Sequence, residues 1–373
     1  MENEQTYDCA IIGGGLAGLC LSIQLVKQGH TVVLFEKNTY PFHKVCGEYI
    51  SKESWAFLIE LGLPLADMQL PEINRLGISS TKEFMLEASL VLGGFGISRY
   101  TLDHRLSLLA KENGVILKEN CKVTNCEELN DSTTITTSNG LFYSKIVCGS
   151  YGKHAPVFIN KSTKNYSPNY IAVKYHIKTS FPDDRIELHN FKDGYCGISK
   201  VEDGKYCLCY LTTTKNLNDY DKDIKKMEEE ILYKNPFLKK YFLESKFLFD
   251  KPLTISQITF EKKQSYSNGV FLLGDAAGAI APLCGNGMSM AMRTSKILAS
   301  LLHKYFKLEI SKSELISAYS HEWDKNFSTR IKAGYYLQQL FGKNKITHLS
   351  LILLNKMPGL MKKIISLTHG KPF

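Results

Sequence analysis

Apolar positions near the start of the chain change their period twice within forty residues. Residues 7–12 form a short, nearly continuous apolar run, which is typical of a buried strand. Residues 16–28 then carry apolar side chains at helical spacing, and Gly29 ends that pattern. A second apolar run, residues 31–36, ends on an acid. This strand–helix–strand order predicts a parallel sheet covered by helices.

A different period appears in the middle of the chain. Residues 169–178 and 186–214 alternate between apolar and polar side chains, as antiparallel strands with one solvated face do. Residues 222–244 are rich in charge at helical spacing, and 253–260 read as a returning strand. We therefore expect a second, sheet-based domain inserted into the first.

Composition limits the class of protein. The chain has 373 residues, of which 44% are hydrophobic and 22% charged, so it holds enough apolar residues for about two folded domains and is not disordered. No apolar run approaches the length of a membrane span, and residues 1–6 are polar, which argues against a secretory signal. The ten cysteines lack paired spacing, so we predict reduced thiols, a cytoplasmic location and no metal site.

The basic excess is concentrated at one end. The formal net charge is +9, and from Lys325 onward there are nine Lys or Arg residues and no Asp or Glu. No nucleic-acid-binding motif accompanies them, so we predict no nucleic-acid partner. Apolar residues between 349 and 367 recur at amphipathic spacing. Two interpretations stay open: a solvated last helix packed on the body, or a peripheral contact with a membrane surface.

A glycine fingerprint follows the first strand. Gly13, Gly15 and Gly18 stand at GxGxxG spacing, and Glu36 follows at the end of the second strand. The first glycine permits the tight turn, the second lets the backbone approach a pyrophosphate, and the third allows helix and strand to pack closely. The acid can accept hydrogen bonds from ribose hydroxyls. This unit predicts a bound dinucleotide.

A second pair of glycine turns lies far along the chain. An apolar strand at 270–273 leads to Gly274 and Asp275, and Gly285-Asn286-Gly287 then opens an apolar helix. An acid at a strand end can hold polyol hydroxyls, and amides at a helix N-terminus stabilise negative charge.

With both turns in place, the chain resembles the FAD-dependent oxidoreductases of the p-hydroxybenzoate hydroxylase-fold superfamily. The resemblance implies FAD as cofactor, with Gly274 and Asp275 at its ribityl and pyrophosphate part, and the Pro282-x-x-Gly285-x-Gly287 turn beside the isoalloxazine ring. It also implies that Arg99, which leads a helix, approaches the FAD linker. The cofactor-binding residues expected are Gly13, Gly14, Gly15, Ala17, Gly18, Glu36, Lys37, Arg99, Gly274, Asp275, Pro282, Gly285, Asn286 and Gly287.

The fold class that follows is α/β, with a Rossmann-type FAD-binding domain, an inserted antiparallel-sheet substrate domain and C-terminal helices. The expected boundaries assign residues 1–75, 99–165 and 262–308 to the FAD-binding domain. Residues 76–98 and 166–261 form the substrate domain, and 309–373 form a basic helical segment.

Outside the cofactor motifs, Cys46 is the candidate catalytic residue. It stands in a Cys-Gly-Glu segment, residues 46–48, that resembles the flavin-side segment of geranylgeranyl reductases. Lys44 is a candidate for the lysine that a halogenase needs; the alternative is an ordinary surface lysine. Tyr151 replaces the acid of a motif that in the family helps NAD(P)H reach FAD, which favours a protein electron donor while NAD(P)H stays open. The proton-donor candidates, each weighed against a structural role, are His43, His154, His176 and His189.

These residues predict an FAD-dependent oxidoreductase, favoured as a geranylgeranyl reductase-like enzyme that reduces a carbon–carbon double bond of an apolar substrate by hydride from flavin N5. The alternative is a monooxygenase or halogenase that acts on an aromatic or polyketide-like substrate through a C4a-hydroperoxyflavin. A third hypothesis is a non-catalytic FAD-binding scaffold.

Overall fold

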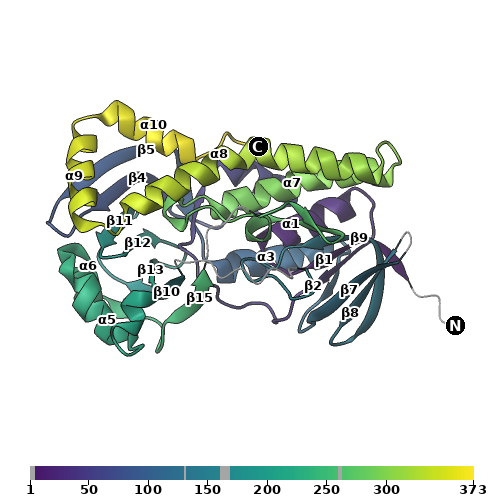
Figure 1. Cartoon of the computed structure of the whole chain (residues 1–373), viewed down its shortest axis with the longest axis horizontal. Coiled ribbons are helices and arrows are strands. Elements are labelled where there is room, and N and C mark those ends of the chain that lie inside the picture. The colour runs from purple at the N-terminus through teal and green to yellow at the C-terminus, as the bar shows by residue number, and fades with distance from the viewer. Residues whose placement is uncertain (1–4, 130–131, 160–168, 259–262) are drawn as a thin grey trace.

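A computed structural model describes residues 5–129, 132–159, 169–258 and 263–373. The chain forms two sheets that lie side by side, with long helices spanning both (Figure 1). This is the expected α/β architecture, with a Rossmann-like unit and C-terminal helices.

The first sheet has the strand order β16-β17-β9-β1-β2-β6, and its central pairs are parallel. Parallel strands buried on both faces account for the continuous apolar runs of the sequence. The strands are β1 (Thr6–Ile12), β2 (Val32–Phe35), β6 (Ile116–Lys118), β9 (Gly140–Gly149), β16 (Tyr266–Ser267) and β17 (Val270–Leu272), with β7 (Val123–Leu129) and β8 (Ser132–Thr137) joined to β9.

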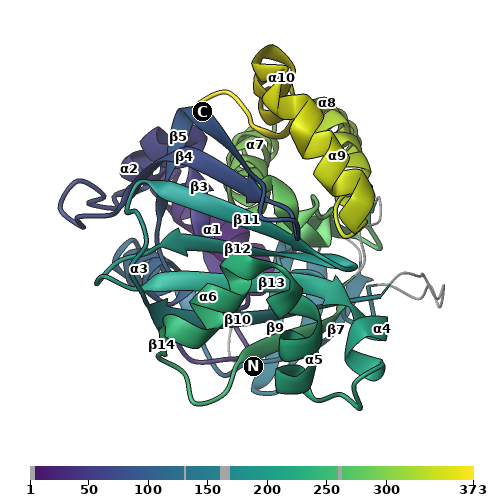
Figure 2. The same cartoon turned by 90° about the vertical axis from the view of Figure 1, so that its left-hand side faces the viewer.

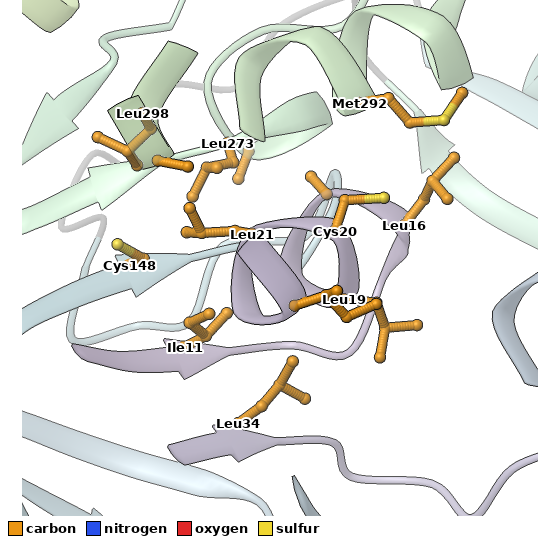
Figure 3. Close-up of a cluster of buried hydrophobic side chains, with 14 of the residues drawn as sticks. Ile11, Leu16, Leu19, Cys20, Leu21, Leu34, Cys148, Leu273, Met292 and Leu298 are labelled. Atoms are coloured by element: carbon orange, nitrogen blue, oxygen red, sulfur yellow. The ribbon is translucent and has the colours of Figure 1, made fainter. Parts of the chain in front are cut away.

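Helix α1 (Leu16–Lys27) lies between this sheet and α7 (Gly287–Phe306) (Figure 3). Its Leu19 and Leu21 are fully buried and contribute to one core with Ile11 of β1 and Leu298 of α7. Fully burying a leucine side chain stabilises the fold by about 1.5–3 kcal/mol, so this helix is held on both sides. The glycine turn that precedes α1 is thereby fixed against the sheet edge. Helix α3 (Arg99–Glu112) also packs on α1.

The second sheet has the order β14-β10-β13-β12-β11-β4-β5-β3, with β15 paired to β10. Its strands are β3 (Tyr49–Ser51), β4 (Glu72–Ser79), β5 (Met85–Gly96), β10 (Tyr170–Lys178), β11 (Arg185–Phe191), β12 (Gly194–Lys200), β13 (Tyr206–Thr213), β14 (Lys246–Phe247) and β15 (Leu253–Ile258). Strands β3 and β4 begin before residue 76, so this sheet takes in more of the N-terminal part than the expected boundary allowed. The pairing of β11 with β4 is parallel, within an otherwise antiparallel sheet.

The two faces of the second sheet carry different helices (Figure 2). Helices α5 (Ile224–Ile231) and α6 (Pro236–Glu244) cover one face and share a core with β10 and β13. On the other face, α9 (Asn344–Asn355) and α10 (Pro358–Thr368) pack beside α8 (Lys312–Leu340). The short helices α2 (Trp55–Leu61) and α4 (Thr214–Asn218) complete the described helices.

The helix expected over 222–244 is interrupted. Asn235 accepts a hydrogen bond from the Phe237 backbone N–H, and Pro236 occupies the first turn of α6. Proline has no N–H to continue a preceding helix but suits the first position of a new one, so the chain turns there. The last 65 residues form three helices, and among the described residues no helix is long and apolar enough to cross a membrane.

Candidate functional site

One continuous cavity of about 880 Å³ runs from the glycine turn before α1 to the space between the second sheet and α8–α10. Most of the residues predicted to bind FAD line it, and Cys46 lines it with them. These residues are Gly13, Gly15, Ala17, Glu36, Lys37, Cys46, Arg99, Gly274, Asp275, Pro282, Gly285 and Gly287. Gly14, Gly18 and Asn286 are absent from the cavity wall.

The N-terminus of α1 offers free hydrogen-bond donors to this cavity. Its N-cap residue is Gly15, which has no capping side chain, and no acid stands in the first turn. The first backbone N–H groups of a helix lack internal partners, so they bind phosphate oxygens readily. Gly18 lies on the inner side of the turn, where a Cβ would overlap the Gly13 carbonyl oxygen. The turn thus has the shape that a pyrophosphate needs.

Glu36 is held in place by the turn itself. One carboxylate oxygen accepts from the Gly14 backbone N–H at 3.0 Å, and the other accepts from the Asn38 backbone N–H at 3.0 Å. The side chain is 5% exposed and lines the cavity at the end of β2. An acid fixed in this way can receive ribose hydroxyls without first reorienting.

Arg99 and Asp103 form a bidentate pair one turn apart on α3. The Arg99 Nε and Nη2 atoms donate to the Asp103 carboxylate at 2.8 and 2.7 Å, and the Lys44 ammonium lies 2.9 Å from the same carboxylate. Burial opposes the charge on Arg99, but the Asp103 carboxylate outweighs burial and keeps the pKa of Arg99 raised. Arg99 is therefore a fixed positive charge on the cavity wall. Lys44, the halogenase-type candidate, forms a salt bridge with Asp103.

A second uncapped helix start faces the cavity at the predicted ring side. Gly287 begins α7, and its N-cap, Asn286, makes no side-chain cap. The Asn286 amide instead donates to the Thr368 carbonyl oxygen at 2.7 Å, at the end of α10. The Asn286 side chain is thus held by α10, and its role in cofactor binding stays a prediction. Because α7 has twenty residues and a free N-terminus, its dipole is available to a developing negative charge.

Cys46 lies next to this helix start. Its sulfur is 3.7 Å from the Met288 sulfur, and its carbonyl oxygen accepts from the Cys207 thiol at 3.2 Å. Cys46 is partly exposed to the cavity, whereas Cys207 is buried. The ten cysteines are free thiols. The structure thus brings the candidate thiol to the cavity wall beside the start of α7.

A buried ionic cluster holds the Cys46 segment against the second sheet. Glu48 is fully buried, accepts from the Lys174 ammonium, and lies 2.6 Å from His176 Nε2. The Lys174 ammonium also donates to the Lys44 carbonyl oxygen at 3.1 Å. Burial would raise the pKa of Glu48, but the hydrogen bond from His176 and the charge of Lys174 outweigh it and keep this pKa below its ordinary value.

Glu48, His176 and Cys207 have the ligand types of a metal site and lie within 4.8 Å of one another. The Lys174 ammonium, however, already supplies the positive charge that faces Glu48. We therefore assign this cluster a positioning role for the loop and no metal.

The four histidine candidates separate into two pairs. His43 and His154 line the cavity, whereas His176 and His189 are buried outside it. Burial lowers the pKa of His43 to about 4, and the Lys174 ammonium adds to this effect. Burial also lowers the pKa of His154. Both imidazoles are therefore neutral at pH 7 and poor proton donors. His189 contacts the Ser79 hydroxyl at 2.8 Å within the sheet.

The far part of the cavity is an apolar chamber that sequence reasoning missed. We define the chamber by aliphatic and aromatic side chains from the second sheet and from α8–α10. They include Leu76, Ile78, Leu90, Ile186, Leu188, Tyr195, Leu211, Leu337, Phe341, Leu351, Leu354, Met361, Ile364 and Ile365. The amphipathic spacing of the last helices was the available signal, but it did not identify the surface they cover. Tyr151 lines the cavity beside the glycine turn.

Comparisons with known proteins agree with this geometry. The profile of the NAD(P)-binding Rossmann-like domain matches residues 11–48, and that of squalene epoxidase matches residues 215–365. Conditioned medium factor receptor 1 of Dictyostelium discoideum is 26% identical over 87% of this chain and 69% of its own. Digeranylgeranylglycerophospholipid reductase of Methanococcus vannielii is 22% identical over 86% and 83%.

Among solved structures, a flavin-dependent brominase shares the fold, with a TM-score of 0.80 and 18% identity over 98% of this chain and 93% of its own. The proteins to which this chain is similar therefore include reductases, monooxygenases and halogenases. The glycine turn, the fixed acid and the two free helix starts fit FAD, the cofactor these proteins share. These likenesses support an FAD-dependent oxidoreductase, similar in sequence to geranylgeranyl reductase-like proteins and squalene epoxidase and in fold to flavin-dependent halogenases.

Proposed function

We propose that this enzyme reduces a carbon–carbon double bond in an elongated apolar substrate, such as an isoprenoid chain. The single observation that carries the proposal is the continuity of the apolar chamber with the groove that fits FAD. An apolar chain in the chamber would be removed from water along its length, and burial stabilises such a complex by about 25 cal/mol per Å² of apolar surface.

FAD, when bound, supplies the redox chemistry of the reaction. The chain's own residues bind, orient and shield. Arg99 provides a fixed positive charge along the cofactor groove, and the start of α7 stabilises negative charge at the ring side. The apolar wall of α9 and α10 excludes water from the double bond.

We assign the proton transfer to the Cys46 thiol. Its sulfur lies beside Met288 in the first turn of α7 and on the cavity wall, and the buried Glu48 cluster restrains the loop that carries it. His43 and His154, with pKa values lowered by burial, are less suited to donate a proton at pH 7.

A second candidate is monooxygenation of the same class of substrate. It is favoured by the squalene epoxidase profile, which matches residues 215–365 and so includes the helices that close the chamber. The two reactions share the chamber and differ in their need for oxygen.

The test uses the FAD-loaded protein, reduced chemically under anaerobic conditions and mixed with a polyprenyl lipid. We expect the flavin to return to its oxidised spectrum without oxygen, and the product to gain two hydrogens by mass spectrometry. A product that gains one oxygen atom, formed only after oxygen is admitted, would establish the second candidate instead. Turnover of a small aromatic substrate but of no apolar chain would refute both.

Two variants separate binding from chemistry. Cys46→Ala removes the thiol and should slow turnover by about a hundredfold with FAD content unchanged, since a positioned proton donor contributes about 10²–10⁴-fold. Leu351→Trp fills the chamber and should weaken substrate binding while the FAD spectrum stays the same. Cys126→Ala is the matched control for the thiol, because Cys126 lies on β7 outside the cavity.

A further inference from the structure

The outer face of α9 and α10 carries a stripe of exposed apolar side chains. Ile346, Leu349 and Leu353 of α9 are 47%, 67% and 56% exposed, and they follow each other at i, i+3 and i+7. Leu360 and Leu367 of α10 continue the apolar surface, at 38% and 44% exposed. We call these five residues the apolar stripe.

Met357 stands at the corner between the two helices and is 45% exposed. Pro358 begins α10 directly after it, so the corner is a sharp turn with an apolar tip. Tyr335 and Tyr336, near the C-terminal end of the neighbouring α8, also expose amphipathic rings. Aromatic side chains of this kind favour a boundary between apolar and aqueous surroundings.

Lysines flank the stripe. They are Lys343, Lys345, Lys356, Lys362 and Lys363, and each is exposed. From Lys325 onward the sequence contains no Asp or Glu that would neutralise them. A surface that combines an apolar stripe with a rim of lysines complements an anionic lipid surface, in which the chains receive the leucines and the headgroups pair with the ammonium groups.

The same two helices form the wall of the chamber on their inner side. Leu351 and Leu354 of α9, with Met361 and Ile365 of α10, line the cavity. One layer of helices therefore separates the apolar stripe from the space assigned to the substrate (Figure 2). A nucleic acid would pair with the lysines but would not bury the exposed leucines. A lipid surface would contact the leucines and the lysines together.

We propose that α9 and α10 dock this protein on an anionic membrane surface, through the apolar stripe and its lysine rim. As an extension that rests on the proposed function, an apolar substrate dissolved in the bilayer would reach the chamber through this wall without crossing water. The docking itself depends only on the outer face.

The experiment is flotation of the FAD-loaded full-length protein with vesicles and no substrate, so its failure would leave the proposed reaction untouched. Vesicles of phosphatidylcholine and phosphatidylserine in equal parts should carry the protein, and vesicles of phosphatidylcholine alone should carry much less. Lys345→Gln, Lys356→Gln and Lys363→Gln combined should weaken partitioning by about a hundredfold, since each lysine near an anionic surface contributes about fivefold. Added salt should weaken the wild type more than this variant, which keeps Lys343 and Lys362 of the rim.

Leu349→Gln with Leu353→Gln should also abolish flotation. The control is Leu243→Gln with Lys239→Gln and Lys240→Gln, which replaces an exposed leucine and two exposed lysines of α6, on the opposite face of the second sheet. Equal loss in the control, or binding independent of phosphatidylserine, overturns the proposal. So does a stable dimer that Leu349→Gln with Leu353→Gln dissociates, or an oligonucleotide that binds the wild type in place of vesicles.

Discussion

Replacing Glu228 by glutamine should remove a pH dependence from the unfolding of this protein. Glu228 lies on α5, is 5% exposed, and accepts hydrogen bonds from the hydroxyls of Tyr175 and Tyr210 at 2.9 and 2.8 Å. Burial raises its pKa from the ordinary value of 4.5 to about 7, against the opposing effect of the two tyrosine hydroxyls. Unlike Glu48, which pairs with the Lys174 ammonium, Glu228 accepts from two neutral hydroxyls.

The sign and size of the effect follow from these values. Below about pH 4.5 the carboxyl is protonated in both the folded and the unfolded chain, so it does not change their balance. Between pH 4.5 and about 7 the unfolded chain releases the proton that the folded chain retains, and the free energy of unfolding falls as the pH rises. At about 1.4 kcal/mol per pH unit the total loss is about 3 kcal/mol, complete above pH 7.

The assay is urea unfolding of wild type and Glu228→Gln at pH 5 and pH 8. Glutamine keeps an oxygen that accepts from both tyrosines but does not ionise. Part of the loss has already occurred at pH 5, so the advantage of the variant over the wild type should grow by about 2.5 kcal/mol between the two pH values. Glu230→Gln, at an exposed position of the same helix, is the control and should show no such growth. Parallel pH dependence in wild type and Glu228→Gln would refute the reasoning.

Three further substitutions test the cofactor groove and the buried cluster. Gly18→Ala should reduce FAD affinity by about tenfold or more in a fluorescence titration, because its Cβ would displace the Gly13 carbonyl, whereas Gly359→Ala, at an open position, should not. Arg99→Ala should lower FAD affinity. Arg105→Ala, at an exposed position of the same helix, should leave FAD affinity unchanged. Equal affinities in the two variants would contradict the role of Arg99. Glu48→Gln should lower the free energy of unfolding by about 3 kcal/mol, because the buried Lys174 loses its charge partner, and an unchanged urea midpoint would disprove the pairing.

The cofactor groove was predictable because its parts are local in sequence. The turn at Gly13–Gly18 and the acid at Glu36 lie on consecutive elements, and the second turn at Gly274–Gly287 follows its own strand. Their order requires no knowledge of long-range pairing. The position of Cys46 on the cavity wall followed from resemblance rather than from any periodicity.

What could not be predicted depends on contacts between distant segments. β4 pairs with β11, so residues 72–75, which the expected boundary left with the FAD-binding domain, belong to a sheet most of whose strands lie about a hundred residues later. Asn286 was predicted from its place between two glycines. Its side-chain amide donates a hydrogen bond to the Thr368 carbonyl oxygen, a contact that the sequence does not indicate. The chamber likewise needs α9 and α10 placed over the second sheet, and amphipathic spacing alone does not name the face that a helix covers.

The first sheet is completed late in the order of synthesis. Strand β17 pairs with β9, so residues 270–272 must return to residues 147–149 after the strands of the second sheet have been made. Until then residues 147–149 of β9 present unpaired N–H and C=O groups on one side, which is the kind of edge that pairs readily with other chains. A ribosome-bound chain therefore cannot finish one domain before it begins the other. The second domain is therefore synthesised before the first can finish folding. Slowed translation before residue 270 would prolong the interval in which this edge is open to aggregation.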